Sequence, residues 1–264
     1  RQMCIRDRIK KDGVERLSKE NVEFIKLGKL IEERKLKFLH NNKRIELDID
    51  HFRDVWFKTS FLLDSEQTNM DECKSKFLNY KNQKLKYKFP NSFTGKIKKG
   101  SYKKNIIAAV IREKGINSER EMAYMLHLSG FEVKDVHMTD LVSGKENLEN
   151  VNMVVFPGGF SNSDVLGSAK GWAGAFKYNE KAKKAINQFY SRSNTLSLGV
   201  CNGCQLMMEL NLIDKKLNGN HPKMEHNNSK KFECTFSGID ILESNSVMLK
   251  NLSGSTLGIW SAHG

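Results

Sequence analysis

From residue 105 onward, short apolar runs alternate with stretches in which apolar side chains recur every three or four positions. Continuous apolar runs are typical of strands buried on both faces, and the longer spacing is typical of amphipathic helices. Strands that alternate with helices form parallel sheets. The pattern therefore predicts an α/β domain with four parallel strands, at residues 105–111, 131–136, 151–156 and 195–200.

Two of the intervening helices have specific signatures. Ser118-Glu-Arg-Glu121 is a capping box, and Met122, Met125 and Leu126 form the predicted buried stripe of the helix that it starts. The second helix is marked by apolar residues at i, i+3, i+4 and i+7, namely Ala182, Ala185, Ile186 and Phe189.

The first part of the chain shows near-alternation of apolar and polar residues, which predicts short antiparallel strands. Gly28 and Asn41-Asn42 are turn signals, and Asp50 is the expected cap of a helix that ends between Asp64 and Asp71. A sheet this small leaves one face uncovered, so we expect it to pack against structure upstream. The predicted strands are residues 22–27, 36–40 and 43–48.

The pattern after residue 205 predicts three more strands, at residues 232–236, 247–249 and 257–260. The chain then ends at Ala262-His263-Gly264 without a closing helix or polar tail, so we expect the domain to continue further. Residues 1–8 fit no element, and no prediction rests on them.

The fourth predicted strand runs directly into Gly199-Val-Cys201-Asn-Gly203. Glycines on both sides of a potential nucleophile are typical of a nucleophile elbow, a sharp strand-to-helix turn with the reactive side chain at its apex. Such a turn places the Cys201 sulfur at a helix N-terminus, whose dipole favours the thiolate. The backbone amide of Asn202 would then face a developing oxyanion.

The third predicted strand ends in Pro157-Gly158-Gly159. Ligands of open parallel sheets bind at the carboxyl ends of the strands, where Cys201 is also expected. A glycine pair lets the backbone approach a substrate closely and offer an amide. The Gly159 and Asn202 amides together would form a two-donor oxyanion hole.

The spacing Cys201-x-x-Cys204 leaves two other interpretations open, a redox pair and half of a zinc site. Redox motifs open a helix without glycine on both sides of the first cysteine. A zinc site needs a second ligand pair, and His221, His226 and Cys234 have no compact spacing. The simplest interpretation of Cys204 is a small buried residue on the helix.

The net charge of +13 belongs almost entirely to residues 1–104, which contain 27 of the 44 lysines and arginines but 15 of the 31 acidic residues. Residues 81–104 hold nine lysines and no acid, interrupted by proline and glycine, which favours a solvated linker over an RNA-binding segment. Five cysteines, no signal peptide and no apolar run of bilayer length predict a soluble, cytoplasmic protein with reduced thiols.

Six motifs stand out between residue 104 and the end of the chain. They are Arg112-Glu-Lys-Gly-Ile-Asn117, Asp135-Val-His-Met-Thr-Asp-Leu141, Gly158-Gly-Phe-Ser161, Asp164-Val-Leu-Gly167, Gly171-Trp172 and Gly199-Val-Cys-Asn-Gly-Cys-Gln205. They closely resemble the glutaminase domain of the phosphoribosylformylglycinamidine synthases, which are class I glutamine amidotransferases of purine synthesis. The resemblance runs from about Lys104 to the last residue, and residues 47–64 resemble the end of the synthetase portion of the single-chain enzymes.

The resemblance implies a flavodoxin-like sheet with helices on both faces and three parts of the chain: residues 1–64 as a synthetase tail, 65–104 as the linker, and 105–264 as the amidotransferase domain. Cys201 would be the nucleophile that hydrolyses glutamine, and Gly159 and Asn202 would stabilise the oxyanion. Phe160, Asp164 and Gln205 would shape the glutamine pocket.

The same resemblance implies that ammonia passes to an ATP-activated formylglycinamide ribonucleotide on upstream synthetase domains. ATP and magnesium would bind there, with no cofactor, metal, nucleic acid or membrane on this chain. The family usually has Tyr-Gly where this chain has Asn162-Ser163. We expect the catalytic base and its acid partner beyond residue 264, with His263, His127 and His137 in structural or surface roles.

Two rival functions remain at this point. One is a non-catalytic binding module whose basic linker contacts nucleic acid. The other is an elbow-cysteine hydrolase of similar fold, which would be reactive without a preference for glutamine.

Overall fold

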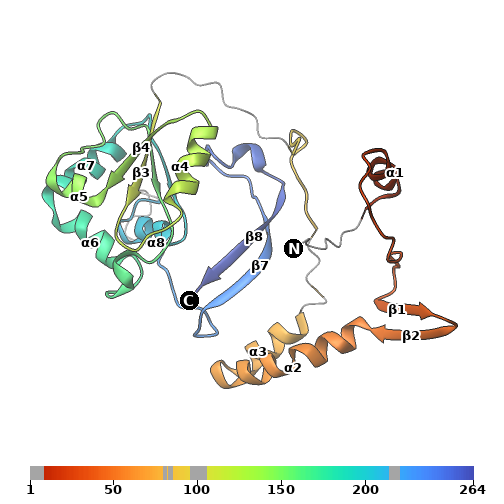
Figure 1. Cartoon of the computed structure of the whole chain (residues 1–264). Helices are drawn as coiled ribbons and strands as arrows, with labels where there is room; N and C mark the ends of the chain where they lie inside the picture. The colour runs from red at the N-terminus through yellow and green to blue at the C-terminus, as the bar shows by residue number, and fades with distance from the viewer. Residues whose placement is uncertain (1–8, 80–81, 83–85, 96–105, 214–220) are drawn as a thin grey trace. The chain divides into compact units, whose positions relative to one another are not determined.

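The computed structural model describes residues 9–79, 82, 86–95, 106–213 and 221–264 (Figure 1). The chain divides into two compact units, Arg1–Asn82 and Gln83–Gly264, and each is described by itself. Most of the lysine-rich run at 81–104 and the unassigned residues 1–8 lie outside the described residues. The predicted three-part division of the chain therefore stays a prediction.

The second unit is built on the predicted four-stranded parallel sheet. Its strands are β3 (Ile107–Arg112), β4 (Glu132–His137), β5 (Met153–Phe156) and β6 (Leu196–Gly199). Their order in the sheet is β4-β3-β5-β6, and every pair is parallel. This is the start of the flavodoxin-like order, with its topological switch point between β3 and β5. The predicted fold class is confirmed.

Alternate residues of β3 and β5 face opposite sides of this sheet and build two apolar clusters. On one side Ala108, Val110 and Val155 pack with Leu126 of α4 (Glu119–Leu128). On the other side the larger cluster includes Ile111 and Phe156. It is covered by α5 (Met138–Ser143), α6 (Lys170–Tyr178), α7 (Glu180–Ser191) and α8 (Asn202–Glu209). Figure 1 shows α4 on one side of β3 and β4, and α5, α6 and α7 on the other.

The predicted stripe of α7 is confirmed, because its four apolar residues are all buried. The predicted capping box at Ser118 is wrong: Ser118 has φ +66°, and its hydroxyl donates to the Asn117 carbonyl at 2.5 Å instead of capping α4. Met125 is also misplaced in the predicted stripe, since it is 53% exposed. A helix on the edge of the sheet buries a narrower stripe than its sequence offers.

The second unit also contains β7 (Glu233–Asp240) and β8 (Thr256–His263), which pair as an antiparallel hairpin. They confirm the strands predicted at residues 232–236 and 257–260, although both run further than predicted and their pairing was not predicted. Lys88 pairs with Thr256 through two backbone hydrogen bonds, of 3.0 and 2.9 Å. Residues 247–249 are not the predicted strand. They lie in a turn that leads to a short 3-10 helix, η3 (Lys250–Leu252), within the connection between the two strands.

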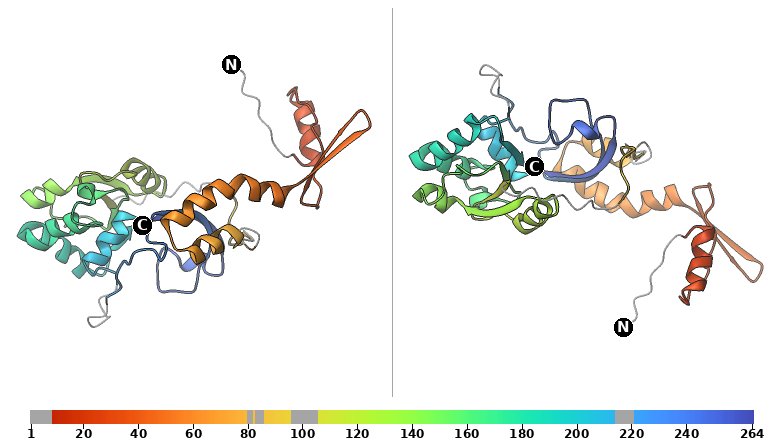
Figure 2. Two further views of the ribbon diagram at one scale, coloured as in Figure 1. Left: turned by 90° about the horizontal axis from the view of Figure 1, so that it is seen from below. Right: turned by 90° about the horizontal axis from the view of Figure 1, so that it is seen from above.

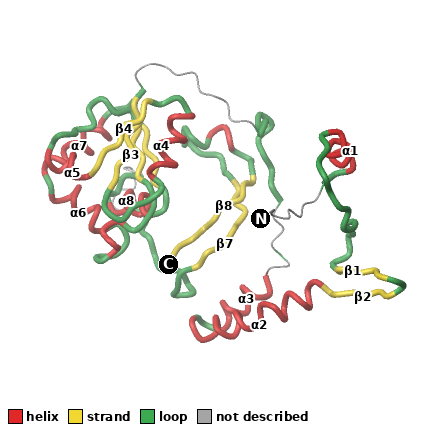
Figure 3. The backbone as a smooth tube through the Cα atoms, in the orientation of Figure 1, coloured by secondary structure: helices red, strands yellow, loops and turns green. Residues whose placement is uncertain are grey.

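The first unit contains α1 (Lys11–Lys19), β1 (Lys35–His40), β2 (Lys43–Asp48), α2 (Ile49–Gln67) and α3 (Met70–Leu78). The β1–β2 hairpin is antiparallel, and both turn residues, Asn41 and Asn42, have positive φ, as a tight hairpin turn requires (Figure 3). The predicted strand at residues 22–27 is wrong, because this segment has no regular structure.

The start of α2 also differs in detail from the prediction. Asp48, rather than Asp50, caps the helix by accepting from the His51 amide at 2.7 Å. Asp50 instead forms an ion pair of 2.6 Å with Arg34. Figure 2 shows α2 as one continuous helix with α3 beside it, and Phe61 of α2 contacts Phe77 of α3. In the described ranges no helix is long and apolar enough to span a bilayer.

Very little of the first unit is buried. In its described part, Cys73 is the one buried apolar residue, and α2 buries none of its nineteen residues. The exposed apolar side chains of α2 include Ile49, Phe52, Val55, Trp56, Phe57, Leu62 and Leu63. Those of the β1–β2 hairpin are Leu36, Phe38, Leu39 and Ile45. The described residues of this unit thus form regular elements but bury almost no apolar side chains.

Candidate active site

The predicted elbow is present between β6 and α8. Cys201 has φ 52° and ψ −113°, a backbone conformation that non-glycine residues rarely adopt and that is held only where the surrounding structure enforces it. The turn is tight: a Cβ atom at Gly203 would lie 1.9 Å from the Phe156 carbonyl oxygen of β5. Only glycine lets α8 start this close to the sheet.

The two thiols of the elbow have different surroundings. Cys201 is exposed, whereas Cys204, one turn along α8, is partly buried. Burial, and secondarily the neighbouring Cys201, raises the pKa of the Cys204 thiol above its ordinary value. Cys73, Cys201, Cys204 and Cys234 are all free thiols, and no group of three metal-ligating side chains occurs in the described segments.

The predicted glycine pair lies directly beside the elbow. A Cβ atom at Gly158 would lie 3.0 Å from Cys201 Cβ and 3.7 Å from its sulfur. Gly159 has φ +119°, and a Cβ atom there would lie 2.6 Å from Ile116 Cα. The carboxyl ends of β5 and β6 therefore bring together the two segments that the sequence analysis named. The role of the Gly159 amide as an oxyanion donor stays a prediction.

The side chain of Asn202 connects these segments, which the sequence analysis did not anticipate. Asn202 is 1% exposed, and its Oδ1 accepts from the Ser161 amide at 3.2 Å. Its Nδ2 donates to Gln205 Oε1 at 3.1 Å and, more weakly, to Asp164 Oδ1 at 3.5 Å. Asp164 and Gln205, both predicted pocket residues, thus converge on Asn202. Phe160 is 62% exposed and does not join this cluster.

The loop after β5 contains a strained 3-10 turn, η2 (Ser161–Asp164). Asn162, Ser163 and Asp164 have φ values of 52°, 56° and 51°, in the left-handed region. That region costs a non-glycine residue about 1–2 kcal/mol, less for Asn or Asp than for Ser. Ser163 stands where the resembled family usually has glycine, so this chain accepts strain at a position beside the site.

A base for Cys201 is not apparent among the described residues, since none forms a hydrogen bond or ion pair with its sulfur. His137 has a structural role: its Nδ1 accepts from the Thr139 amide at 3.2 Å and caps α5. The His263 carbonyl on β8 accepts from Asn227 Nδ2 at 2.8 Å. The prediction that the base lies elsewhere in a longer chain stays a prediction.

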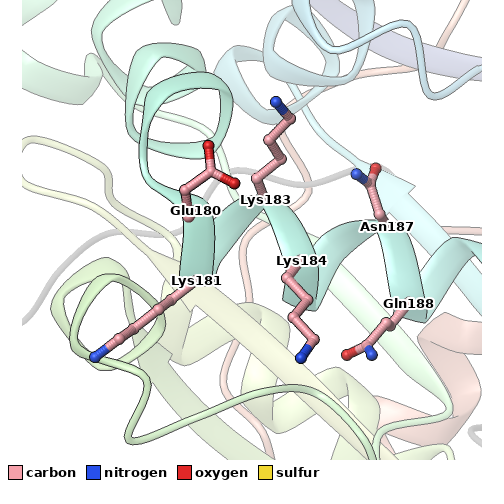
Figure 4. A pocket seen from close by; sticks show the side chains of 6 residues that line it. All are labelled: Glu180, Lys181, Lys183, Lys184, Asn187 and Gln188. Carbon is pink, nitrogen blue, oxygen red and sulfur yellow. The ribbon is translucent and has the colours of Figure 1, made fainter.

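Two of the hollows among the described residues of the second unit show where a ligand could lie. One, of about 470 Å³, is the outer polar face of α7, and none of its residues belongs to the predicted site (Figure 4). The other, of about 420 Å³, reaches the predicted site through Gln205. It is also lined by Lys170, His221 and Lys223, whose polar side chains suit a polar ligand group next to Gln205.

The second unit combines a parallel α/β sheet with a cysteine at a strained strand-to-helix turn. These two features place it in the class of α/β proteins that carry a nucleophile elbow. Within that class, the family of CobB/CobQ-like glutamine amidotransferase domains matches residues 105–264, and the chain belongs to this family.

Curated relatives match a longer stretch of the chain. The probable chloroplastic/mitochondrial phosphoribosylformylglycinamidine synthase of Arabidopsis thaliana is 41% identical over 80% of this chain and 16% of its own length. The phosphoribosylformylglycinamidine synthase of Dictyostelium discoideum is 38% identical over 94% of this chain and 18% of its own. A chain in the solved structure of PurLQS from Thermotoga maritima aligns with 61% of this chain over 67% of its own length, with 26% identity and a TM-score of 0.48. The chain thus spans less than a fifth of the two curated relatives.

Proposed function

We propose that residues 105–264 are the glutamine-hydrolysing domain of a phosphoribosylformylglycinamidine synthase. The observation that carries this proposal is the contact between Gly158 and Cys201 at the strained elbow. It places a close-approaching backbone segment next to an exposed thiol, which is the arrangement that acyl transfer from an amide requires. The family of glutamine amidotransferase domains supports the choice of glutamine, and the two curated relatives support the choice of synthase.

In the proposed reaction the Cys201 thiolate attacks the carboxamide carbon of glutamine. A carbon–sulfur bond forms, and the carbonyl electron pair moves onto oxygen, where the Gly159 and Asn202 amides stabilise it. Neither amide donates to an acceptor within the described segments. The carbonyl then re-forms as the carbon–nitrogen bond breaks, and the nitrogen takes a proton from water or from the acid–base group proposed elsewhere in a longer chain and leaves as ammonia. Water hydrolyses the glutamyl thioester to glutamate and returns the Cys201 thiol. Asp164 and Gln205 orient the substrate beside Asn202, and exposed Phe160 covers it.

The proposed partner is the synthetase portion of the same enzyme. The first unit supports this, because α2 and the β1–β2 hairpin expose apolar side chains that a stable protein normally buries. We propose that these faces pack against synthetase domains, where ATP and magnesium bind and where ammonia reacts with formylglycinamide ribonucleotide. We also propose a cytoplasmic location, although one relative is described as chloroplastic/mitochondrial.

A chloromethyl ketone analogue of L-glutamine, in which CH₂Cl replaces the amide NH₂, tests the proposed substrate. The thiolate displaces chloride, so the adduct is permanent and can be mapped by mass spectrometry. We expect adduct on Cys201 from the L enantiomer and several-fold less from the D enantiomer. Equal labelling by both enantiomers would favour an elbow hydrolase without glutamine preference. Absence of adduct on Cys201 would favour a binding module.

A further inference from the structure

The Gly158–Gly159 peptide is held by the loop that follows β3. The Asn117 amide donates to the Gly158 carbonyl at 2.9 Å, and the Phe160 amide donates to the Gly115 carbonyl at 2.9 Å. These two bonds form a short antiparallel bridge between Ile116 and Gly159. A third bond, from the Asn162 amide to the Lys114 carbonyl at 2.7 Å, extends the pairing.

This pairing fixes the direction of the Gly159 N–H. All peptide bonds of the described chain are trans, so the Gly158 C=O and the Gly159 N–H point in opposite directions. Because the carbonyl points to Asn117, the N–H points away from the Lys114–Asn117 loop. Gly158 itself lies against Cys201. The Gly159 N–H is therefore turned away from that loop, in the peptide that follows the residue lying against Cys201.

Gly115 is the residue that makes this pairing possible. It has φ +86°, and a Cβ atom there would lie 2.2 Å from the Phe160 carbonyl oxygen. The obstacle is backbone, which cannot move aside without breaking the bridge. Any larger residue at position 115 therefore displaces the Gly159 peptide.

The Asn202 side chain holds the same loop from the other side. Its backbone amide is one proposed oxyanion donor, and its buried Oδ1 binds the Ser161 amide, two residues after the other donor. Asn202 thus connects the elbow to the loop after β5 through hydrogen bonds of its side chain.

We infer that Gly115 and the Asn202 side chain are positioning residues that preset the oxyanion hole. They fix the orientation of the Gly159 amide relative to Cys201 without touching the substrate. The inference rests on the proposed function for the identity of the nucleophile, but it concerns the geometry of the hole and is independent of which amide or ester is attacked.

The test compares two reactions of Cys201 in the whole chain. p-Nitrophenyl butyrate, which keeps the four carbons from the amide carbon to Cα of glutamine, is attacked at its carbonyl. A carbon–sulfur bond forms through an oxyanion, and p-nitrophenolate leaves as a stable anion, so no proton donor is needed. Iodoacetamide instead loses iodide in a direct displacement at a saturated carbon and makes no oxyanion. The ratio of the acylation rate to the alkylation rate therefore reports on the oxyanion hole and not on the reactivity of the thiol.

The variants are Gly115→Ala and Asn202→Ala, with Cys201→Ala as the blank. Gly144→Ala is the matched control, because Gly144 has a similar φ of +80° but its Cβ would meet only the flexible Lys181 side chain. We expect both positioning variants to lower the acylation rate about tenfold or more, as the loss of an oxyanion donor does. We expect iodoacetamide rates within about twofold of the unmodified chain, because thiol exposure is unchanged.

Acylation rates in both positioning variants equal to that of Gly144→Ala would overturn the inference. If Gly115→Ala loses both reactions because it does not fold, the ratio in Asn202→Ala decides. Failure of the proposed function has a different signature: the glutamine analogue then fails to label Cys201, while the effect of Gly115 on ester acylation persists.

Discussion

The two units of this chain contain comparable secondary structure but differ in what that structure buries. In the second unit both faces of the sheet are covered, and Trp172, Phe156 and Phe176 are fully buried. In the first unit a nineteen-residue helix buries nothing. Local sequence patterns are thus enough to form a helix or a strand, whereas a core also needs a second apolar surface to pack against.

The largest difference in stability is expected when one tryptophan is removed from each unit. Trp172→Ala, which removes a side chain that is 0% exposed, should lower the stability of the second unit by about 3–5 kcal/mol. Trp56→Ala, at a side chain that is 81% exposed, should change stability by less than about 0.5 kcal/mol. Thermal unfolding followed by circular dichroism measures both. Similar losses would show that α2 has a partner surface within this chain.

One glycine-to-alanine substitution in each unit compares how closely the backbone is packed in the two units. Gly203→Ala should cost about 2–3 kcal/mol, since the new Cβ atom overlaps the Phe156 carbonyl and pushes α8 off the sheet. Gly28→Ala in the first unit has no atom within 4 Å of its Cβ and should be nearly neutral. Urea unfolding gives both values. An unchanged free energy of unfolding in Gly203→Ala would mean that α8 does not pack closely against the Phe156 carbonyl.

The thiols distinguish exposed from protected sites in both units. At pH 7.5 iodoacetamide should modify exposed Cys201 about tenfold faster than Cys204, whose raised pKa keeps it protonated, and than buried Cys73. The rate at Cys204 should increase as the pH is raised, because more of its thiol is then deprotonated. Peptide mapping over time measures each site. Equal rates for Cys201 and Cys204 at pH 7.5 would contradict the burial of Cys204.

The smallest effect concerns strain at the site. Ser163→Gly should stabilise the second unit by about 0.5–1 kcal/mol, because glycine adopts its φ of 56° without steric cost. Asn42→Gly, at a φ of 61° in the first unit, should gain less, since Asn tolerates this region better than Ser does. The melting temperature of each variant, compared with that of the unmodified chain, measures the two gains in stability. A loss of stability in Ser163→Gly would show that the Ser163 side chain makes a favourable contact.

Much of the second unit could be predicted from the sequence, because buried parallel strands are continuous apolar runs and α7 has a clear stripe. The failures share a cause: residues 22–27 and 247–249 have strand-like composition without neighbours that complete a sheet. Ser118 failed as a cap because its left-handed backbone turns the hydroxyl to Asn117.

Cys201 and the Gly158–Gly159 pair could be predicted because each motif is local in sequence. The bridge between Ile116 and Gly159 could not, and neither could the bond from the Ser161 amide to Asn202. These contacts join residues about forty positions apart, which only the closed fold brings together. The chemical groups of the site can therefore be predicted from local motifs, whereas the contacts that orient them cannot.

Competition by glutamine itself shows whether Cys201 lies in a site built for glutamine. Cys201 is labelled with the L-chloromethyl ketone at a limiting concentration while L-glutamine is raised to saturation, with D-glutamine as the matched control. We expect L-glutamine to slow labelling of Cys201 several-fold and D-glutamine to leave it unchanged, and we expect neither to affect labelling of exposed Cys234. Labelling of Cys201 that L-glutamine leaves unchanged would contradict a site built for glutamine.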